Sequence, residues 1–266
     1  MKKRRIIYYK DELNDEFADT QKKETKIGKD FKYIRKSLVW RFFAFIAYRV
    51  IMTPIAFIHC KVKFSLKVIG KEKLKPFRKK GVFIYGNHTL QAGDAFIPNV
   101  VTFPKKTYVV VKSANLSTRG TKTFITMNGA IPIPTEISAM RNFLGALEKR
   151  SVEGSAIMIY PEAHIWPYYT GIRPFKSVSF AYPVKFGDPA FCTTVTYRKR
   201  KRRETPKIVV YLDGPFYADK TLPTKEATEK LRNEIYEQML KRAKSSDYEY
   251  IEYRKEGTTD GGRYSQ

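Results

Sequence analysis

The sequence predicts an α/β fold in which a single layered domain contains a mixed, largely parallel sheet flanked by helices. Two observations predict this class: short apolar runs typical of buried strands alternate with stretches of helical period, and polar turns follow several of these runs directly. In such folds the loops at the strand ends carry the chemistry. A third observation, the strongly apolar stretch Leu38 to Cys60, predicts an N-terminal membrane-associated helical region in front of the domain.

The composition is that of a folded and strongly basic protein. A chain of 266 residues is long enough for a sizeable core, and 42% hydrophobic residues with 14% aromatic residues exclude global disorder. The 51 Lys and Arg residues outnumber the 26 Asp and Glu residues, for a formal charge of +25. We therefore expect an anionic partner, which is nucleic acid, a membrane surface, a phosphorylated substrate or an acidic carrier protein.

The cysteines and the first residues favour a cytoplasmic location. Cys60 and Cys192 are too few for a disulfide framework, so a reducing compartment fits. The apolar run Ile6 to Tyr9 is too short for a signal peptide, because Asp11 follows it closely. We expect no export and a membrane-associated protein on the cytoplasmic face of the cell membrane.

Polarity divides the chain into four parts. They are a polar N-terminal arm (1–37), a membrane-associated helical segment (38–60), the α/β domain (61–250) and a flexible tail (251–266). In the second part, Arg49 would cost about 2.5 to 3.5 kcal/mol at the centre of a bilayer, and Pro54 is expected to break a helix. We therefore favour one or two helices lying in the headgroup region; the alternatives are two core-packed helices and a single span.

Within the domain, the period of the apolar residues predicts the elements. The expected strands are Lys61–Gly70, Val82–Tyr85, Thr107–Lys112, Asn128–Pro134, Ser155–Tyr160, Ala190–Tyr197 and Lys207–Asp213. The first of these alternates apolar and mostly basic residues, which is typical of a half-buried strand. A short helix is expected within Ala114–Met127, and amphipathic helices are expected over Ser138–Arg150 and Thr224–Lys244.

The stretch Gly81 to Phe96, GVFIYGNHTLQAGDAF, contains a candidate general base. Its apolar start predicts a buried strand that leads into a polar turn holding His88, and five residues separate His88 from Asp94. His88 would accept a proton, and Asp94 would bind the other ring nitrogen, which fixes the tautomer and stabilises the imidazolium. The alternative is that His88 is a loop histidine and Asp94 a helix N-cap.

Four short motifs occur in order along the chain: NHTLQAGD at Asn87–Asp94, GAIPI at Gly129–Ile133, YPEAH at Tyr160–His164 and PFK at Pro174–Lys176. In order and spacing they resemble the glycerolipid acyltransferases, and among these the lysophosphatidate acyltransferases. The resemblance covers roughly Lys61 to Tyr211. It implies that His88 deprotonates an acceptor hydroxyl, which attacks the thioester carbonyl of an acyl donor, while Asp94 holds His88. The donor would be acyl-CoA or acyl carrier protein, the acceptor a lyso-phospholipid, and no cofactor or metal is implied.

The chain also departs from the family pattern. The family places four residues between the His and the Asp, and we expect a bulge at Ala92 and Gly93 to absorb the additional residue. Thr135 and Ile165 stand where the family has arginines after the second motif and in the third. These two losses concern the acceptor side of the site.

Other residues are candidates for the acceptor side. By resemblance, Glu162 helps to shape the acceptor site. Since a phosphate needs a cation more than a fixed position, the candidates to replace the missing arginines are Arg173, Lys176, Lys112, Arg119 and Arg141.

Alternative interpretations remain for two groups of residues. His88, Asp94, Glu162 and His164 are of metal-ligating type, but no repeated Cys or His spacing of a structural zinc site accompanies them. The six cations Arg198 to Arg203 suggest nucleic acid, a hairpin pressing on anionic lipid, or a solvated hairpin tip. No nucleic-acid-binding fingerprint accompanies them, so we expect an anionic membrane surface and no nucleic acid. A catalytically weak lipid-binding protein of the same fold is the first alternative function, and a basic nucleic-acid-binding protein is the second.

Overall fold

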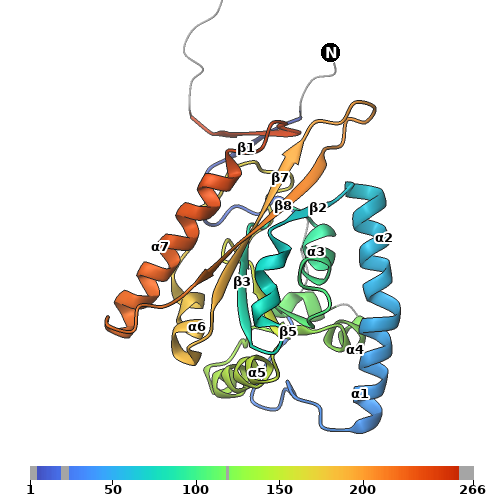
Figure 1. Ribbon diagram of the computed structural model, residues 1–266, viewed down its shortest axis with the longest axis vertical. Helices are drawn as coiled ribbons and strands as arrows, with labels where there is room; N and C mark the ends of the chain where they lie inside the picture. The colour runs from blue at the N-terminus through green and yellow to red at the C-terminus, as the bar shows by residue number, and fades with distance from the viewer. Residues whose placement is uncertain (1–4, 19–23, 118–119, 258–266) are drawn as a thin grey trace, which may run out of the picture.

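A seven-stranded sheet forms the centre of the computed structural model, which describes residues 5–18, 24–117 and 120–257 (Figure 1). Its strand order is β2-β8-β7-β3-β6-β4-β5. The strands are β2 (Lys67–Ile69), β3 (Val82–Gly86), β4 (Thr107–Val111), β5 (Ala130–Pro132), β6 (Ala156–Ile159), β7 (Ala190–Arg198) and β8 (Lys207–Phe216). All neighbouring strands are parallel except β7 and β8, which form an antiparallel hairpin. The fold is therefore α/β with a mixed, largely parallel sheet.

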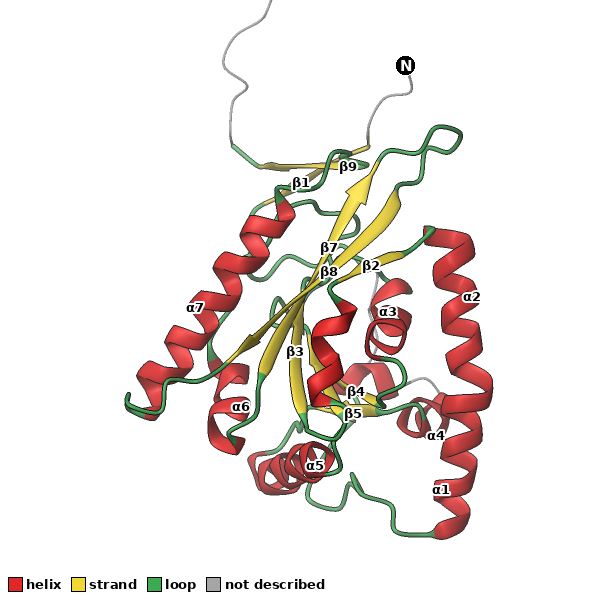
Figure 2. Ribbon diagram, in the orientation of Figure 1, coloured by secondary structure: helices red, strands yellow, loops and turns green. Residues whose placement is uncertain are grey.

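Helices cover both faces of the sheet (Figure 2). They are α1 (Leu38–Phe45), α2 (Thr53–Phe64), α3 (Gly93–Thr102), α4 (Thr121–Met127), α5 (Met140–Val152), α6 (Ala181–Phe186) and α7 (Thr224–Ala243). Short 3₁₀ helices lie at Lys71–Phe77, Ser113–Leu116, Ile137–Ala139 and Val178–Phe180.

The alternation of side chains along β3 separates two hydrophobic cores. Val82 and Ile84 face a core that includes residues of α2 and α3. Phe83 and Tyr85 face the opposite core, to which α5 and α7 contribute. Every residue of β3 is buried because both faces are covered, as in parallel sheets generally.

The apolar N-terminal stretch forms one continuous helix rather than one broken at Pro54. A π-helical stretch, Ile46–Met52, joins α1 to α2, and Pro54 lies in the first turn of α2, where a missing backbone N–H is tolerated. The expected strand Lys61–Gly70 is wrong: α2 continues to Phe64, and only Lys67–Ile69 is extended. The physical reason is burial at helical spacing, since Ala56, Cys60 and Phe64 pack together on the sheet.

The outer side of this helix is apolar and exposed. Large exposed side chains follow its length: Leu38, Val39, Phe42, Phe43, Phe45, Val50, Ile51, Ile55, Phe57, Ile58 and Val62. Among the described residues, Leu38–Phe64 is the one helix that is long and apolar enough to cross a membrane, and 28% of its most apolar window is buried in the protein. So little burial does not fit two core-packed helices and is consistent with membrane association.

The two ends of the described chain pair with each other. β1 (Arg5–Tyr9) and β9 (Ile251–Lys255) form a separate parallel two-stranded sheet. The expectation of a flexible tail from residue 251 is therefore wrong for β9, while residues 258–266 lie outside the described part. The reason is aromatic packing: Tyr9, Phe17 and Tyr253 surround the buried ring of Trp166 with centroid distances of 4.8, 5.2 and 5.0 Å. The described parts of the arm, 5–18 and 24–37, contact the domain rather than being solvated throughout, and Ile27 is fully buried.

Candidate active site

His88 lies in the turn that follows the carboxyl end of β3. The neighbouring Asn87 is buried and pairs with the backbone of Val195 in β7, donating to its carbonyl at 3.2 Å and accepting from its N–H at 2.8 Å. Gly86 ends the strand. A Cβ atom at this position would lie only 2.4 Å from the Met158 side chain, so a larger residue there would displace that side chain. The turn therefore leaves the sheet at a fixed point, in contact with two neighbouring strands.

Asp94 lies in the first turn of α3 and contacts His88. His88 Nδ1 is 2.7 Å from Asp94 Oδ2, and the same oxygen accepts the Leu90 N–H at 2.9 Å. The side chain of Asp94 is almost fully buried, whereas that of His88 is 18% exposed. The two residues thus form a carboxylate–imidazole pair whose histidine is partly exposed to solvent.

The additional residue between His88 and Asp94 is absorbed by a turn, and the expected glycine bulge is wrong. Ala92 is right-handed helical, Gly93 is the first residue of α3, and the Asp94 N–H donates to the Leu90 carbonyl at 2.9 Å. Gly93 is needed for space rather than for a left-handed backbone. A Cβ there would lie 2.8 Å from the Leu90 Cβ and 3.2 Å from the Phe64 ring.

Tyr160 supports the pair from the end of β6. Its ring stacks on the His88 ring with centroids 4.4 Å apart, and its hydroxyl donates to the Asp94 carbonyl at 2.7 Å. Burial raises the pKa of the Asp94 carboxyl, and the hydrogen bond from His88 opposes this by favouring the charged form. Because Nδ1 is held by Asp94, the Nε2 atom of His88 is the nitrogen left to accept a proton.

Glu162 and Arg173 lie beneath His88 as a buried ion pair. Glu162 accepts the His88 N–H at 3.0 Å and the Arg173 N–H at 3.2 Å, and Arg173 Nη2 is 3.4 Å from its carboxylate. Arg173 also donates to the carbonyls of Glu12 and His164. Its side chain is 1% exposed and that of Glu162 is 0% exposed. These positions do not fit direct binding of the acceptor, because neither charged group reaches solvent. Glu162 instead holds the backbone N–H of His88, and Arg173 holds Glu162 in turn.

The other predicted acceptor residues lie apart from the pair. Lys112 Nζ is 3.3 Å from His164 Nδ1 and 3.6 Å from Glu16, so it pairs with the arm. Lys176 is exposed and has no hydrogen bond or ion pair with the described residues around His88. Arg141 is exposed on α5, and Arg119 lies outside the described residues.

Described residues of the N-terminal arm contact Thr135 and Ile165, the two residues at which the resemblance leads us to expect arginines. Thr135 Oγ1 accepts the Ile27 N–H at 2.9 Å. Glu16 accepts the Ile165 N–H at 3.0 Å, and its other carboxylate oxygen is 3.0 Å from His164 Nδ1. Sequence reasoning missed Glu16 because its partner His164 is 148 residues away and no local pattern connects them.

The structure gives no support to the interpretation of His88, Asp94, Glu162 and His164 as metal ligands. Within residues 5–18, 24–117 and 120–257, no three His, Cys, Asp or Glu side chains converge as a metal site would require. His164, one of the residues of metal-ligating type, faces Glu16 and Lys112 instead.

Comparisons with known proteins bear on the family and on the fold. Residues 65–212 match the family model named Acyltransferase. The fold is similar to the crystal structure of the 1-acyl-sn-glycerophosphate (LPA) acyltransferase PlsC from Thermotoga maritima, with a TM-score of 0.50 and 14% sequence identity, over 78% of this chain and 94% of that chain. At this identity the similarity establishes a shared fold. A comparison with curated proteins found no match.

Proposed function

The chain belongs to the Acyltransferase family, and on that premise we propose that it transfers a fatty acyl group from a thioester donor to a hydroxyl of a lyso-phospholipid such as 1-acyl-glycerol-3-phosphate. The donor is acyl-CoA or acyl carrier protein, and the reaction belongs to phospholipid biosynthesis. The observation that carries the proposal is the 2.7 Å contact between His88 and Asp94 at the carboxyl end of β3.

The geometry supports a general-base mechanism. His88 Nε2 takes the proton of the acceptor hydroxyl as its oxygen attacks the thioester carbonyl, and Asp94 stabilises the imidazolium that forms. The tetrahedral intermediate collapses with cleavage of the C–S bond, and the proton on Nε2 passes to the departing thiolate. The products are the ester and the free thiol, so His88 returns to its neutral form.

The residues around the pair act by positioning it. Glu162 binds the backbone N–H of His88, and Arg173 neutralises the buried Glu162 carboxylate. Positioning matters because a general base must lie within hydrogen-bond distance of the proton that it removes. On the acceptor side, the exposed Lys176 and Lys112 remain our candidates for the phosphate contacts.

The outer surface supports action on a membrane. The basic hairpin between β7 and β8 lies beside the end of the apolar helix, where Arg200 donates to the Lys63 carbonyl at 2.8 Å. An anionic bilayer would attract these cations while the exposed apolar face of α1 and α2 enters the headgroup region. We propose the cytoplasmic face of the cell membrane.

The test is acyl transfer by the purified protein from acyl-CoA, and in parallel from acyl carrier protein, to a panel of lyso-phospholipids that includes lysophosphatidate. Activity in the wild type that falls at least about 100-fold in His88→Ala is expected, since general-base catalysis contributes on the order of 10² to 10⁴. Circular dichroism and vesicle binding establish that the variant is folded and still bound. A folded His88→Ala protein with full activity would contradict the mechanism.

A second candidate function is lipid binding with little catalysis. The observation that favours it is the arm, which contacts Thr135 and Ile165 where the family has arginines. Vesicle binding by a folded wild-type protein that is silent with every donor and acceptor would support this alternative.

A further inference from the structure

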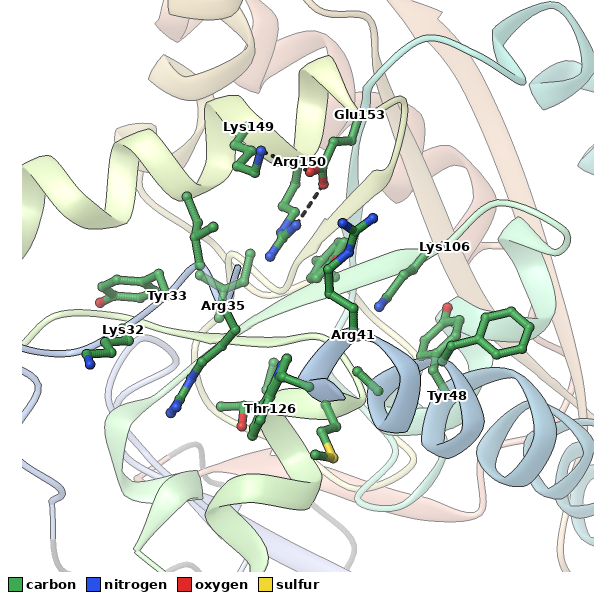
Figure 3. Close-up of a pocket in the computed structure, with 18 of the residues that line it drawn as sticks. Lys32, Tyr33, Arg35, Arg41, Tyr48, Lys106, Thr126, Lys149, Arg150 and Glu153 are labelled. Carbon is green, nitrogen blue, oxygen red and sulfur yellow. Dashed lines mark hydrogen bonds and ion pairs between the residues drawn. The ribbon is translucent and has the colours of Figure 1, made fainter. Parts of the chain in front are cut away.

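A cavity of about 480 Å³ lies beside α1 (Figure 3). His88 is not among its lining residues. Residues 31–36 of the arm, the inner side of α1 and the end of α5 form its walls, and Lys106 and Tyr108 contribute from the start of β4. β3, β4 and β6 are parallel. Lys106 precedes β4 whereas His88 follows β3, so the cavity and the catalytic pair lie at opposite edges of the sheet.

The lining of this cavity is strongly cationic. Its eight cations face one carboxylate, that of Glu153; the cations are Lys32, Arg35, Lys36, Arg41, Arg49, Lys106, Lys149 and Arg150. Figure 3 shows Arg41, Lys106 and Arg150 directed toward a common space from three different elements. We call these residues the basic pocket.

The single carboxylate, that of Glu153, does not neutralise the positive charge of the basic pocket. Glu153 is 3.3 Å from Lys149 and 2.7 Å from Arg150. Arg49 donates through Nη2 to the Pro104 carbonyl, and its buried Nη1 atom has no hydrogen-bond partner among the described residues. Lys106 instead lies 5.0 Å from the ring centroids of both Tyr48 and Tyr108, a cation–π contact, and no side chain or carbonyl of the described residues accepts a hydrogen bond from its ammonium group.

Holding these cations together without an anion costs free energy. Burial, together with the charges of Arg150 and Arg49, lowers the pKa of Lys106 to about 8. Guanidinium and ammonium groups drawn from separate segments into one cavity are the arrangement that binds phosphate, because several charge-assisted hydrogen bonds then converge on one group.

The surroundings indicate an amphiphilic ligand. Trp40 and Arg41 on α1 line the pocket, while Leu38, Val39 and Phe42 on the same helix are exposed. A phosphate in the pocket would therefore lie next to an apolar surface of the protein.

We propose that the basic pocket binds the phosphate of an anionic phospholipid whose acyl chains lie along the exposed face of α1. This site is separate from the acceptor site of the proposed reaction. It holds the helix against the membrane through one specific headgroup, in addition to the non-specific attraction of the basic surface.

The experiment measures the melting temperature of the full-length protein with dihexanoyl phosphatidate, dihexanoyl phosphatidylcholine or inorganic phosphate, at constant ionic strength. Phosphatidate at about 100-fold above its Kd should raise the melting temperature by about 5 to 10 °C. Phosphatidylcholine should have little effect. Inorganic phosphate should bind more weakly than phosphatidate, and equal affinity would exclude the lipid as the source of the phosphate.

Substitutions inside and outside the basic pocket show where phosphatidate binds. Lys106→Gln should weaken phosphatidate about 10- to 100-fold, as expected for one lost charge-assisted contact. Arg35→Gln, at an exposed position, provides a second test that does not depend on the folding of a buried variant. Lys241→Gln on α7 makes the same change in net charge outside the pocket and should bind as the wild type does. His88→Ala should also keep the effect. Because phosphatidate is also the product of the proposed reaction, the losses in Lys106→Gln and Arg35→Gln are what assign the effect to the basic pocket.

Two outcomes would overturn the proposal. In one, phosphatidate raises the melting temperature of Lys106→Gln and of Arg35→Gln as much as it raises that of the Lys241→Gln control. In the other, phosphatidate stabilises the wild type no more than phosphatidylcholine does.

Discussion

The charged groups at the two edges of the sheet differ in how far the chain itself neutralises them. At the carboxyl edge, buried charges are paired within the chain: Asp94 with His88, and Glu162 with Arg173. At the amino edge, the eight cations of the basic pocket face one carboxylate. Charges that are paired within the chain fix the geometry of a site. An excess of one sign, which the lining itself does not balance, favours a ligand of the opposite charge.

The largest expected effect concerns the paired charge of the catalytic edge. Asp94→Asn keeps the shape of the side chain and an oxygen that can accept from His88, but it removes the charge that stabilises the imidazolium. We expect kcat to fall about 10² to 10⁴-fold with a small change in KM. Steady-state kinetics across pH would check this. A kcat within a few-fold of the wild type would show that the pair is structural.

The second prediction concerns the buried ion pair between Glu162 and Arg173, which supports the turn that holds His88. Glu162→Gln leaves the Arg173 guanidinium buried and uncompensated, so the free energy of unfolding should fall by about 3 to 5 kcal/mol. Chemical denaturation measures it. The double variant Glu162→Gln with Arg173→Met removes both charges and should recover much of the loss. Additive losses in the double variant would mean that the two side chains stabilise the fold independently.

The catalytic edge was largely predictable because its main residues are close in sequence. His88 and Asp94 are six positions apart, after an apolar run that predicted β3 within one residue. The roles of Glu162 and Arg173 were not predictable in the same way. A sequence shows that an arginine is present, but its burial depends on Glu12, Glu162 and His164, which reach it through the fold.

The third prediction uses the unbalanced charge of the basic pocket. The pKa of Lys106 is lowered to about 8, so between pH 8 and 10.5 the unfolded chain binds a proton that the folded protein does not. The stability that this contributes is present above pH 10.5 and is lost as pH falls through 8. Without an anion, Lys106→Gln should therefore be more stable than the wild type at pH 7, by about 1 to 2 kcal/mol.

The pH dependence separates this effect from ordinary repacking. The advantage of Lys106→Gln should shrink toward zero as pH rises to 10.5, and Lys241→Gln, outside the pocket, should show no such advantage at pH 7. Arg49, Arg150, Glu153 and Tyr108 surround Lys106, and none changes between the two variants. A Lys106→Gln protein that is less stable than the wild type at pH 7 would contradict the charge imbalance.

The basic pocket was not predictable from the sequence. Its cations come from the arm, α1, the π-helical stretch, the start of β4 and the end of α5, and only the fold brings them together. A charge of +25 predicted an anionic partner but not its place. The same reason explains the missed strand β9, whose partner β1 lies at the other end of the chain. Elements set by local period were predictable, and contacts between distant segments were not.

The smallest expected effect concerns the arm, which reaches both edges of the sheet. Its segment near Ile27 is held by Thr135, whose hydroxyl accepts the N–H of the fully buried Ile27. Thr135→Val keeps the shape and leaves that N–H without its acceptor, so the free energy of unfolding should fall by about 1 kcal/mol. Thr135→Ser retains the hydroxyl and is the matched control. Hydrogen exchange at the Ile27 amide should become about tenfold faster in Thr135→Val alone, because local opening of the arm exposes it. Equal exchange in both variants would show that packing of Ile27, rather than this hydrogen bond, holds the arm over the position where the family has an arginine.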